Sequence, residues 1–284
     1  MNTAMPVARQ WEVNGLRLAG LCWGNERLPP VLALHGWLDN AASFERLAPL
    51  LERHHVVALD LTGHGQSSWR SADASYQIWD DLPELMAVLA QLGWAQFDLL
   101  GHSRGAIISA ILASTMPERI GHLVLLDAMF APTIPEHDFP QQMAKFLQDK
   151  PRLLKHRGRF YSTERKAVAA RTKNGLSEHA ARALACRGLH EQDGGFIWNS
   201  DPRLHGASAV KLTQGQNQAI AQNLTMPTLI LLAEDGLSRS SASPANLNRY
   251  GANVHTEIMP GGHHFHMEDG AAKVAARIAR FLAV

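Results

Sequence analysis

The sequence predicts an α/β protein in which helices flank a mostly parallel β-sheet, and two observations lead to this fold class. Short, nearly continuous apolar runs alternate with segments of helical periodicity over the first 130 residues. Of the 284 residues, 46% are hydrophobic and 19% are charged, a composition typical of a globular chain with a sizeable core. Disordered and collagen-like chains are therefore excluded.

The chain opens with a predicted antiparallel hairpin. Apolar residues alternate with other residues at 11–13 and at 16–21, and the pair Asn14-Gly15 separates these two segments. Asn-Gly between alternating segments is the strongest short-range signal for a hairpin. We therefore expect an antiparallel edge ahead of the parallel part of the sheet.

The remaining strands are predicted from apolar runs of strand length. Their nearly continuous apolar character is typical of strands that are buried on both faces of a sheet. The expected strands are 31–34, 56–59, 97–100, 123–126 and 228–232, with 254–259 as the last strand. Apolar residues at helical spacing predict helices at 43–52, 78–92, 104–116 and 273–282.

The stretch 132–223 breaks this rhythm, because it has helical periodicity, many polar residues and no convincing buried strand. We expect it to be an inserted helical cap between two parts of one α/β core, 1–131 and 224–284. Within it, 150–173 holds nine Lys and Arg against the single acid Glu164. This basic segment is interpreted either as a solvated helix face or as a lid that attracts anionic substrates.

Charge and cysteine content exclude several classes of partner. Lys and Arg number 27 against 26 Asp and Glu, so a net charge of +1 predicts no nucleic acid partner. Cys22 and Cys186 have neither disulfide nor zinc spacing and are expected to be apolar fillers. No apolar run reaches about 18 residues, and the first ten residues lack a signal stretch. A cytoplasmic protein without stable membrane insertion is expected, and a homo-oligomer is compatible with the sequence.

A serine nucleophile is predicted at the motif Gly101-His102-Ser103-Arg104-Gly105, which lies between an apolar strand and a helical segment. A sharp strand-to-helix turn would hold the Ser103 hydroxyl at the carboxyl edge of the sheet, and the two glycines would prevent backbone clashes. The amino end of the following helix favours developing negative charge. We therefore expect Ser103 to be the nucleophile.

A serine hydroxyl needs a base at neutral pH, and here the base is expected after the last strand. The loop 260–268 holds His263, His264 and His266, and its glycines would let a histidine reach Ser103. We choose His263, keep His264 as the alternative and expect His266 to support the loop. A metal site formed by the three histidines is a further interpretation, but no acidic or cysteine pattern completes it. No metal is therefore expected.

The acid that orients the base has two candidates at strand ends. Asp235 follows a buried strand and precedes Gly236, which suits a turn toward the histidine loop. It is the preferred acid. Asp127 also follows a strand and is the alternative, although it is interpreted first as a cap or turn residue. Asp60 and His64 are expected to stabilise turns near the site.

Donors for an oxyanion are expected from two backbone amides. One belongs to the residue after the nucleophile, Arg104, and the other to Trp37 in the loop after the strand 31–34. Gly36 would permit the tight approach of this loop. These two amides are the predicted oxyanion hole.

Two segments, together with the serine motif and the order of elements, resemble the α/β-hydrolase superfamily. The sequence His-Gly-Trp-Leu-Asp-Asn-Ala-Ala-Ser-Phe at 35–44 and the stretch 195–204 are similar to its serine hydrolase-like branch. The resemblance implies an α/β-hydrolase fold with an eight-stranded sheet, a nucleophile at Ser103, a base at His263 and no cofactor. It departs at the acid, because many relatives carry Gly-x-x-Asp where this chain has Ala233 followed by Glu234 and Asp235.

These expectations define a reaction. Ser103 would attack the acyl carbon of a small to medium carboxylic ester or thioester, and water would then release the acid. One alternative is a carbon-carbon bond hydrolase that acts on diketones, which uses the same serine chemistry. The other alternative is a noncatalytic ligand-binding protein of the same fold. The expected partner is thus a small-molecule ester.

Overall fold

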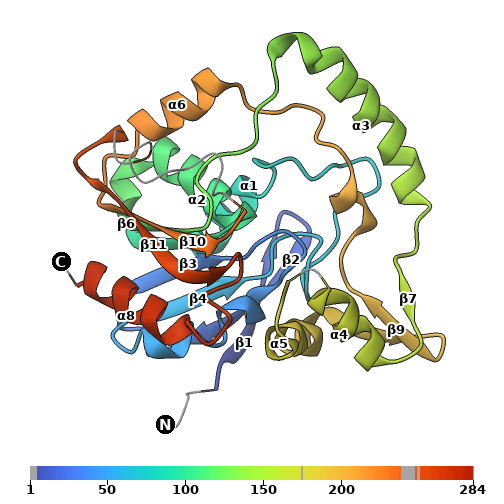
Figure 1. Ribbon diagram of the computed structural model, residues 1–284, viewed down its shortest axis with the longest axis horizontal. Helices are drawn as coiled ribbons and strands as arrows, with labels where there is room; N and C mark the ends of the chain where they lie inside the picture. The colour runs from blue at the N-terminus through green and yellow to red at the C-terminus, as the bar shows by residue number, and fades with distance from the viewer. Residues whose placement is uncertain (1–4, 174, 238–246, 248–249, 284) are drawn as a thin grey trace.

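One eight-stranded sheet forms the centre of the computed structural model, which describes residues 5–173, 175–237, 247 and 250–283 (Figure 1). Its strand order is β1-β2-β4-β3-β5-β6-β10-β11. The strands are β1 Val7–Val13, β2 Leu16–Trp23, β3 Pro30–Leu34, β4 His55–Leu59, β5 Phe97–His102, β6 Ile120–Leu126, β10 Thr228–Asp235 and β11 Val254–Gly262. Only β2 pairs antiparallel to its neighbours, β1 and β4, and the other pairs are parallel. The predicted fold class is confirmed.

The hairpin forms at the predicted turn. Asn14 has φ 52° and Gly15 has φ 77°, and Val13 pairs with Leu16 directly across the turn. Two consecutive residues with positive φ define the two-residue turn that matches the twist of antiparallel strands. The turn at Asn14-Gly15 therefore brings β1 and β2 together as the antiparallel edge of the sheet.

Helices cover both faces of the sheet, and each covered face has its own apolar core. Helices α1 (Leu82–Leu92) and α2 (Arg104–Thr115) contribute to one core, and α8 (Ala271–Phe281) contributes to the other. The predicted helices at 104–116 and 273–282 are confirmed to within two residues, whereas α1 begins four residues later than expected. The residues that pack onto the sheet are thus those with the predicted helical spacing.

The predicted helix at 43–52 is wrong. Two short 3-10 helices, Ala41–Phe44 and Ala48–Leu50, occupy this stretch. Pro49 has no N–H to donate to the carbonyl four residues earlier, so an α-helix cannot continue through it. Three buried side chains still reach the core at spacings of three and four, which explains the misleading pattern; they are Phe44, Leu47 and Leu51.

The insertion between β6 and β10 contains both helices and a small antiparallel sheet. Its helices are α3 Phe139–Leu154, α4 Glu164–Thr172, α5 Glu178–Gly188 and α6 Gln214–Gln222, with short 3-10 helices at Glu136–Asp138 and Pro202–His205. The sheet has the order β7-β9-β8, from β7 Phe160–Tyr161, β8 Leu189–Gln192 and β9 Gly195–Trp198. The insertion is thus mainly helical, as expected, but it also contains a small sheet that the sequence did not predict, and the division at 132 and 223 stays a prediction.

A buried ion pair joins this insertion to the sheet. The Nε of Arg187 in α5 lies 2.9 Å from Oδ2 of Asp60, and both side chains are buried. The Asp60 carboxylate also accepts hydrogen bonds from the backbone amides of Ala41 (2.7 Å) and Gln66 (2.8 Å). Asp60 therefore holds three separate segments in place, consistent with its expected role in stabilising turns.

No helix in the described part of the chain is both long enough and apolar enough to span a membrane.

Candidate active site

Ser103 lies at the sharp turn between β5 and α2. Its backbone has φ 51° and ψ −115°, which is a strained conformation for a residue with a side chain. A Cβ on Gly101 would meet the backbone of Ala106 at 2.5 Å, and one on Gly105 would collide with the carbonyl oxygen of Leu34. The two motif glycines are thus required for the turn that presents the serine.

His263 connects Ser103 to a carboxylate. The imidazole Nε2 lies 2.9 Å from the Ser103 Oγ, and Nδ1 lies 2.5 Å from Oδ2 of Asp127. A carboxylate can only accept at Nδ1, so Nδ1 carries the proton and Nε2 is left to accept from the serine hydroxyl. Asp127 is fully buried and His263 is largely buried. The structure thereby connects a serine hydroxyl, an imidazole and a carboxylate in one hydrogen-bonded chain.

The preferred acid, Asp235, is wrong as the partner of His263, because Asp127 occupies that position. Asp127 directly follows β6 and has φ 50°, and its carboxylate accepts hydrogen bonds from the backbone amides of Ala233 and Leu237, both at 3.0 Å. Asp235 is exposed at the end of β10. A Cβ on Gly236 would collide with the carboxylate oxygens of Asp127. The glycine after Asp235 is thus needed because a side chain at position 236 would clash with the Asp127 carboxylate.

The alternative base, His264, faces a different carboxylate. Its Nε2 lies 3.3 Å from Oδ2 of Asp39. The proximity of His263 to Ser103 therefore agrees with the preferred choice of base, and its chemical role remains a proposal.

The two residues chosen as oxyanion donors lie at the ends of their expected elements. Arg104 is the first residue of α2, where backbone amides have no acceptor within the helix. Trp37 follows β3, and its indole Nε1 donates to the carbonyl of Leu204 in the insertion at 2.9 Å. The next residue, Leu38, has φ 61°. Arg104 is next to Ser103 in the chain, and the role of the two amides as an oxyanion hole stays a prediction.

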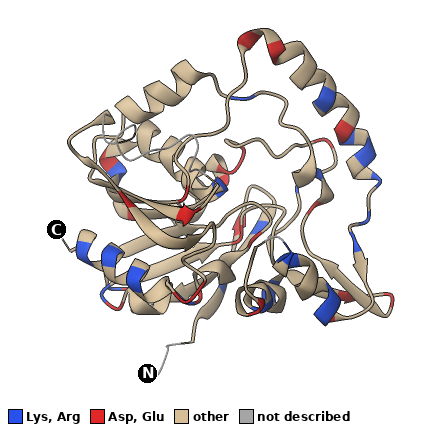
Figure 2. Cartoon of the chain, in the orientation of Figure 1, with Lys and Arg blue, Asp and Glu red and all other residues tan. Residues whose placement is uncertain are grey.

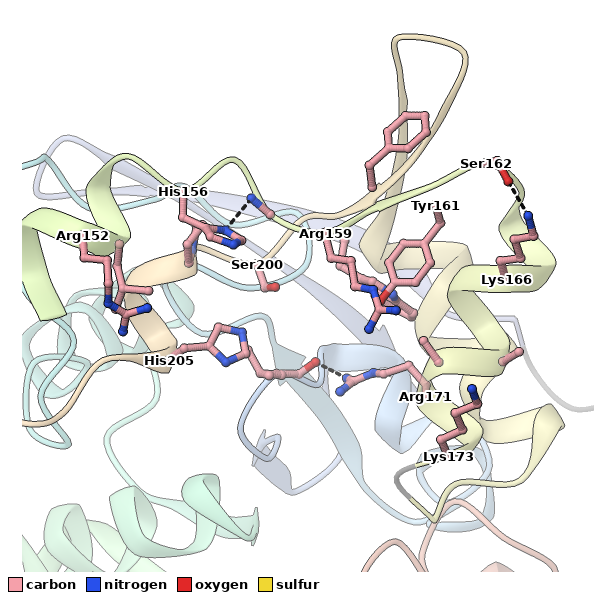
Figure 3. Close-up of a pocket in the computed structure, with 18 residues that line it drawn as sticks. Arg152, His156, Arg159, Tyr161, Ser162, Lys166, Arg171, Lys173, Ser200 and His205 are labelled. Carbon is pink, nitrogen blue, oxygen red and sulfur yellow. Dashed lines mark hydrogen bonds between the residues drawn. The ribbon is translucent and has the colours of Figure 1, made fainter.

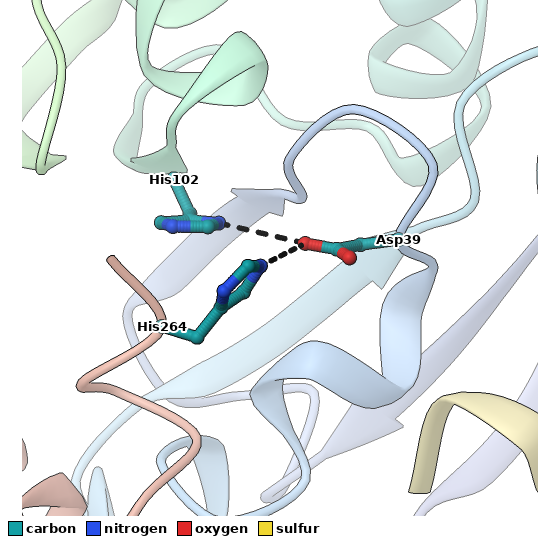
Figure 4. A group of neighbouring side chains, drawn as sticks. All are labelled: Asp39, His102 and His264. Atoms are coloured by element: carbon teal, nitrogen blue, oxygen red, sulfur yellow. Dashed lines mark hydrogen bonds and ion pairs between the residues drawn. The ribbon is translucent and has the colours of Figure 1, made fainter. Parts of the chain in front are cut away.

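A second polar group lies beside the serine and contains Asp39, His102 and His264, with ligand atoms within 4.8 Å of one another (Figure 4). This set differs from the histidine trio considered in the sequence. Burial alone would raise the pKa of the Asp39 carboxyl, but the hydrogen bond from His264 and the nearby Arg171 bring it below its ordinary value. Arg171 already lies 3.2 Å from Oδ1 of Asp39 and would repel a cation on that carboxylate. We therefore interpret the group as a hydrogen-bonding and ion-pair network.

His266 is fully buried, and neither ring nitrogen has a hydrogen-bond partner among the described residues. Its ring packs 5.7 Å from that of Phe44 and 4.2 Å from that of His102. Burial and the neighbouring histidines lower the pKa of both His102 and His266 well below 6.5. The structure therefore contains imidazoles that are neutral in the folded state at neutral pH, and His266 contacts its surroundings by packing; its role in supporting the loop stays a prediction.

These buried histidines predict a loss of stability in mild acid. As the pH falls below about 6.5, the unfolded chain binds protons at His102 and His266 that the folded chain does not bind. The free energy of unfolding therefore falls with pH, by about 1.4 kcal/mol per pH unit for each such group. Urea unfolding between pH 7.5 and 5.5 measures this slope. His266→Phe should make the slope shallower, whereas His137→Gln, at an exposed position, should not. An unchanged slope in His266→Phe would contradict the prediction.

A large basic cavity lies in the insertion, and the sequence indicated its charge but not its shape. Nine Lys and Arg are spread along 150–173, which runs from the end of α3 past β7 into α4 (Figure 2). A cavity of about 1000 Å³ lies beside this stretch, and it also borders Leu38, next to Trp37. Residues of β7 and β9 form part of the cavity wall. These strands are too short to give an apolar run, so the sequence did not predict the cavity.

The comparisons with known proteins define the family. A profile described as "alpha/beta hydrolase fold" matches residues 29–271. The chain therefore belongs to the α/β-hydrolase family, and it is a hydrolase.

Its relatives place it in the serine hydrolase-like branch. It is 30% identical to a serine hydrolase-like protein of Danio rerio over 278 residues, covering 93% of this chain and 85% of that protein. It is also 30% identical to a probable serine hydrolase of Drosophila melanogaster over 279 residues, covering 92% and 82%. The crystal structure of the hypothetical protein PA1622 from Pseudomonas aeruginosa PAO1 matches with a TM-score of 0.93 and 38% identity, covering 99% of this chain and 100% of that one.

Proposed function

We propose that the protein is a serine hydrolase that cleaves carboxylic esters or thioesters of small to medium size through an acyl-enzyme. The observation that carries this proposal is the hydrogen-bonded chain from Ser103 through His263 to Asp127, with distances of 2.9 and 2.5 Å. The small-molecule substrate class expected from the sequence fits this chemistry. The proposed triad is Ser103, His263 and Asp127.

The first step forms a bond between the Ser103 Oγ and the acyl carbon. The proton of the hydroxyl moves to Nε2 of His263, and the Asp127 carboxylate stabilises the resulting imidazolium through Nδ1. The negative charge on the former carbonyl oxygen is accepted by the backbone amides of Trp37 and Arg104. Each such donor typically contributes about 3 kcal/mol of transition-state stabilisation. The bond to the leaving group then breaks, and His263 returns its proton to that group.

The second step releases the acid. A water molecule replaces the leaving group, gives a proton to His263 and attacks the acyl carbon of the ester on Ser103. Collapse of this second tetrahedral species breaks the bond to Ser103, which recovers its proton from the imidazole. The net reaction consumes one ester or thioester and one water, and it produces a carboxylic acid and an alcohol or thiol.

A fluorophosphonate probe tests whether Ser103 is an activated nucleophile. We expect the probe to label the native protein covalently, because it reacts with serines that a histidine deprotonates. Mass spectrometry of the labelled peptide should place the adduct on Ser103, and Ser103→Ala should remain unlabelled. Ser109→Ala is the matched control, since Ser109 is buried within α2 and lies outside the proposed triad. Absence of labelling in the native protein would favour the noncatalytic alternative.

A further inference from the structure

The large cavity in the insertion is lined by basic residues without acidic ones. Its walls come from the end of α3, from β7 and α4, and from the segment 198–205 (Figure 3). No Asp or Glu occurs among the residues that the structure assigns to its lining. Five of the nine Lys and Arg of the basic segment 150–173 do line it; they are Arg152, Arg159, Lys166, Arg171 and Lys173.

Three of these five cations are not neutralised by the protein. Arg152 pairs with Asp149 at 2.7 Å, and Arg171 pairs with Asp39 at 3.2 Å. Within the described chain, no carboxylate lies within ion-pair distance of the other three cations. These are Arg159, Lys166 and Lys173. Three uncompensated charges around one concave space favour an anion there.

Hydrogen-bond donors and aromatic rings complete the cavity. Arg159 lies over the ring of Tyr161 at 5.3 Å, which orients its guanidinium, and Lys166 Nζ lies 2.8 Å from the hydroxyl of Ser162. Phe160 and Trp198 also line the cavity. Aromatic rings of this kind can stack against a heterocyclic base or a similar flat group.

The cavity is continuous with the loop that carries a proposed oxyanion donor. Leu38 lines it directly, and Arg171 donates to the carbonyl oxygen of Leu38. His205, another lining residue, packs against the indole of Trp37 with ring centroids 5.1 Å apart. The cavity therefore borders the loop that carries Trp37, through Leu38 and through His205, which packs on the indole.

The number of charges and the volume together point to a phosphorylated group. A single carboxylate needs one arginine, whereas a phosphate carries up to two charges and accepts bidentate hydrogen bonds from arginine. A cavity of about 1000 Å³ lies at the upper end of the range typical of small-molecule sites. It therefore exceeds what a small acid requires.

We propose that this cavity binds the phosphate groups of an acyl thioester whose thiol is a phosphorylated carrier, as in coenzyme A. This proposal rests on the proposed function, since the thioester would be hydrolysed at Ser103. Water adds to the acyl carbon, the carbon-sulfur bond breaks, and the thiol leaves with the proton that His263 supplies. The phosphates are not changed in the reaction and contribute only to binding.

The test compares two acetyl thioesters that differ in the carrier on sulfur, and the charge-matched variants described below isolate the part that the phosphates contribute. Acetyl-coenzyme A carries phosphates, and the acetyl thioester of N-acetylcysteamine carries none. We expect the native enzyme to prefer acetyl-coenzyme A by at least about tenfold in kcat/KM, chiefly through KM. The preference should decrease as ionic strength rises.

Two triple variants with the same change in net charge separate the effect of the cavity cations from the effect of the overall positive charge. The triple variant Arg159→Gln, Lys166→Gln and Lys173→Gln removes three lining cations. The control is Lys155→Gln, Arg157→Gln and Arg165→Gln, which removes three exposed cations of the same segment that do not line the cavity. The substrate preference should fall toward one in the first variant and persist in the second. Equal preference in the native enzyme, or equal loss in both variants, would overturn the proposal.

Binding to Ser103→Ala keeps the phosphate site testable independently of turnover. Titration calorimetry should detect coenzyme A binding to Ser103→Ala, and the triple variant of lining cations should weaken it. Failure of coenzyme A to bind would overturn the phosphate site alone. Equal affinity for inorganic phosphate would also overturn it, because it would indicate a site for a small free anion. Absence of fluorophosphonate labelling and of turnover would instead overturn the proposed function.

Discussion

Replacing His263 with alanine is expected to lower kcat for p-nitrophenyl acetate by about 10⁵- to 10⁶-fold, because its Nε2 is the only base within hydrogen-bond distance of the Ser103 hydroxyl in the described part of the chain. The structure shows only one imidazole bonded to that hydroxyl among the described residues. Steady-state hydrolysis, with active enzyme counted by protein concentration and fold checked by circular dichroism, measures the loss.

His264→Ala is the matched control for this experiment. His264 lies next in the chain and is buried to the same extent, but its Nε2 faces Asp39 rather than Ser103. We expect its loss to lower kcat by far less than the loss of His263. A larger effect for His264→Ala would reverse the assignment of the base.

Replacing Asp127 with asparagine is expected to lower kcat by about 10⁴-fold. An amide can donate a hydrogen bond to Nδ1, which would place the imidazole proton on Nε2 and leave no lone pair for the serine hydroxyl. The asparagine keeps the shape of the buried side chain, but its amide nitrogen cannot accept the backbone hydrogen bonds that the carboxylate takes from Ala233 and Leu237, so circular dichroism is needed to check that the fold is retained. A pH profile of kcat/KM separates the loss of the acid from a loss of folded protein.

Asp235→Asn is the control for the acid, since Asp235 is exposed at the end of β10. We expect this variant to retain kcat within a few-fold of the native enzyme. If Asp235→Asn were instead the variant that abolishes turnover, the acid of the triad would be Asp235 and the geometry around Asp127 would have only a structural role.

The parts of the fold that the sequence predicts well are those in which local pattern and burial coincide. Strands β3, β4 and β5 are buried on both faces, so their apolar runs are nearly uninterrupted. The small sheet of the insertion gives no such run, because its strands are only two to four residues long and because β7 and β8 are mostly exposed. A signal for its turn is nevertheless present in the sequence. Asp193-Gly194, with φ values of 53° and 74°, is an Asp-Gly pair of the kind that favours a two-residue hairpin turn, like Asn14-Gly15 in the first hairpin.

The same distinction applies to the residues of the site. Ser103 and His263 follow from local motifs, a strand-to-helix turn and a glycine-supported loop. The acid depends on the register of two strands that are distant in sequence: Leu126 pairs with Leu231, so the next residue, Asp127, is level with the middle of β10. Asp235 lies farther along the same strand. Sequence spacing carries no information about this register, which is why the two acids could not be separated.

The buried pair of Arg187 and Asp60 restricts how the insertion can move. A motion that carried α5 away from the sheet would have to separate these two ions. We therefore expect α5 to keep its place against the core while substrate enters and product leaves.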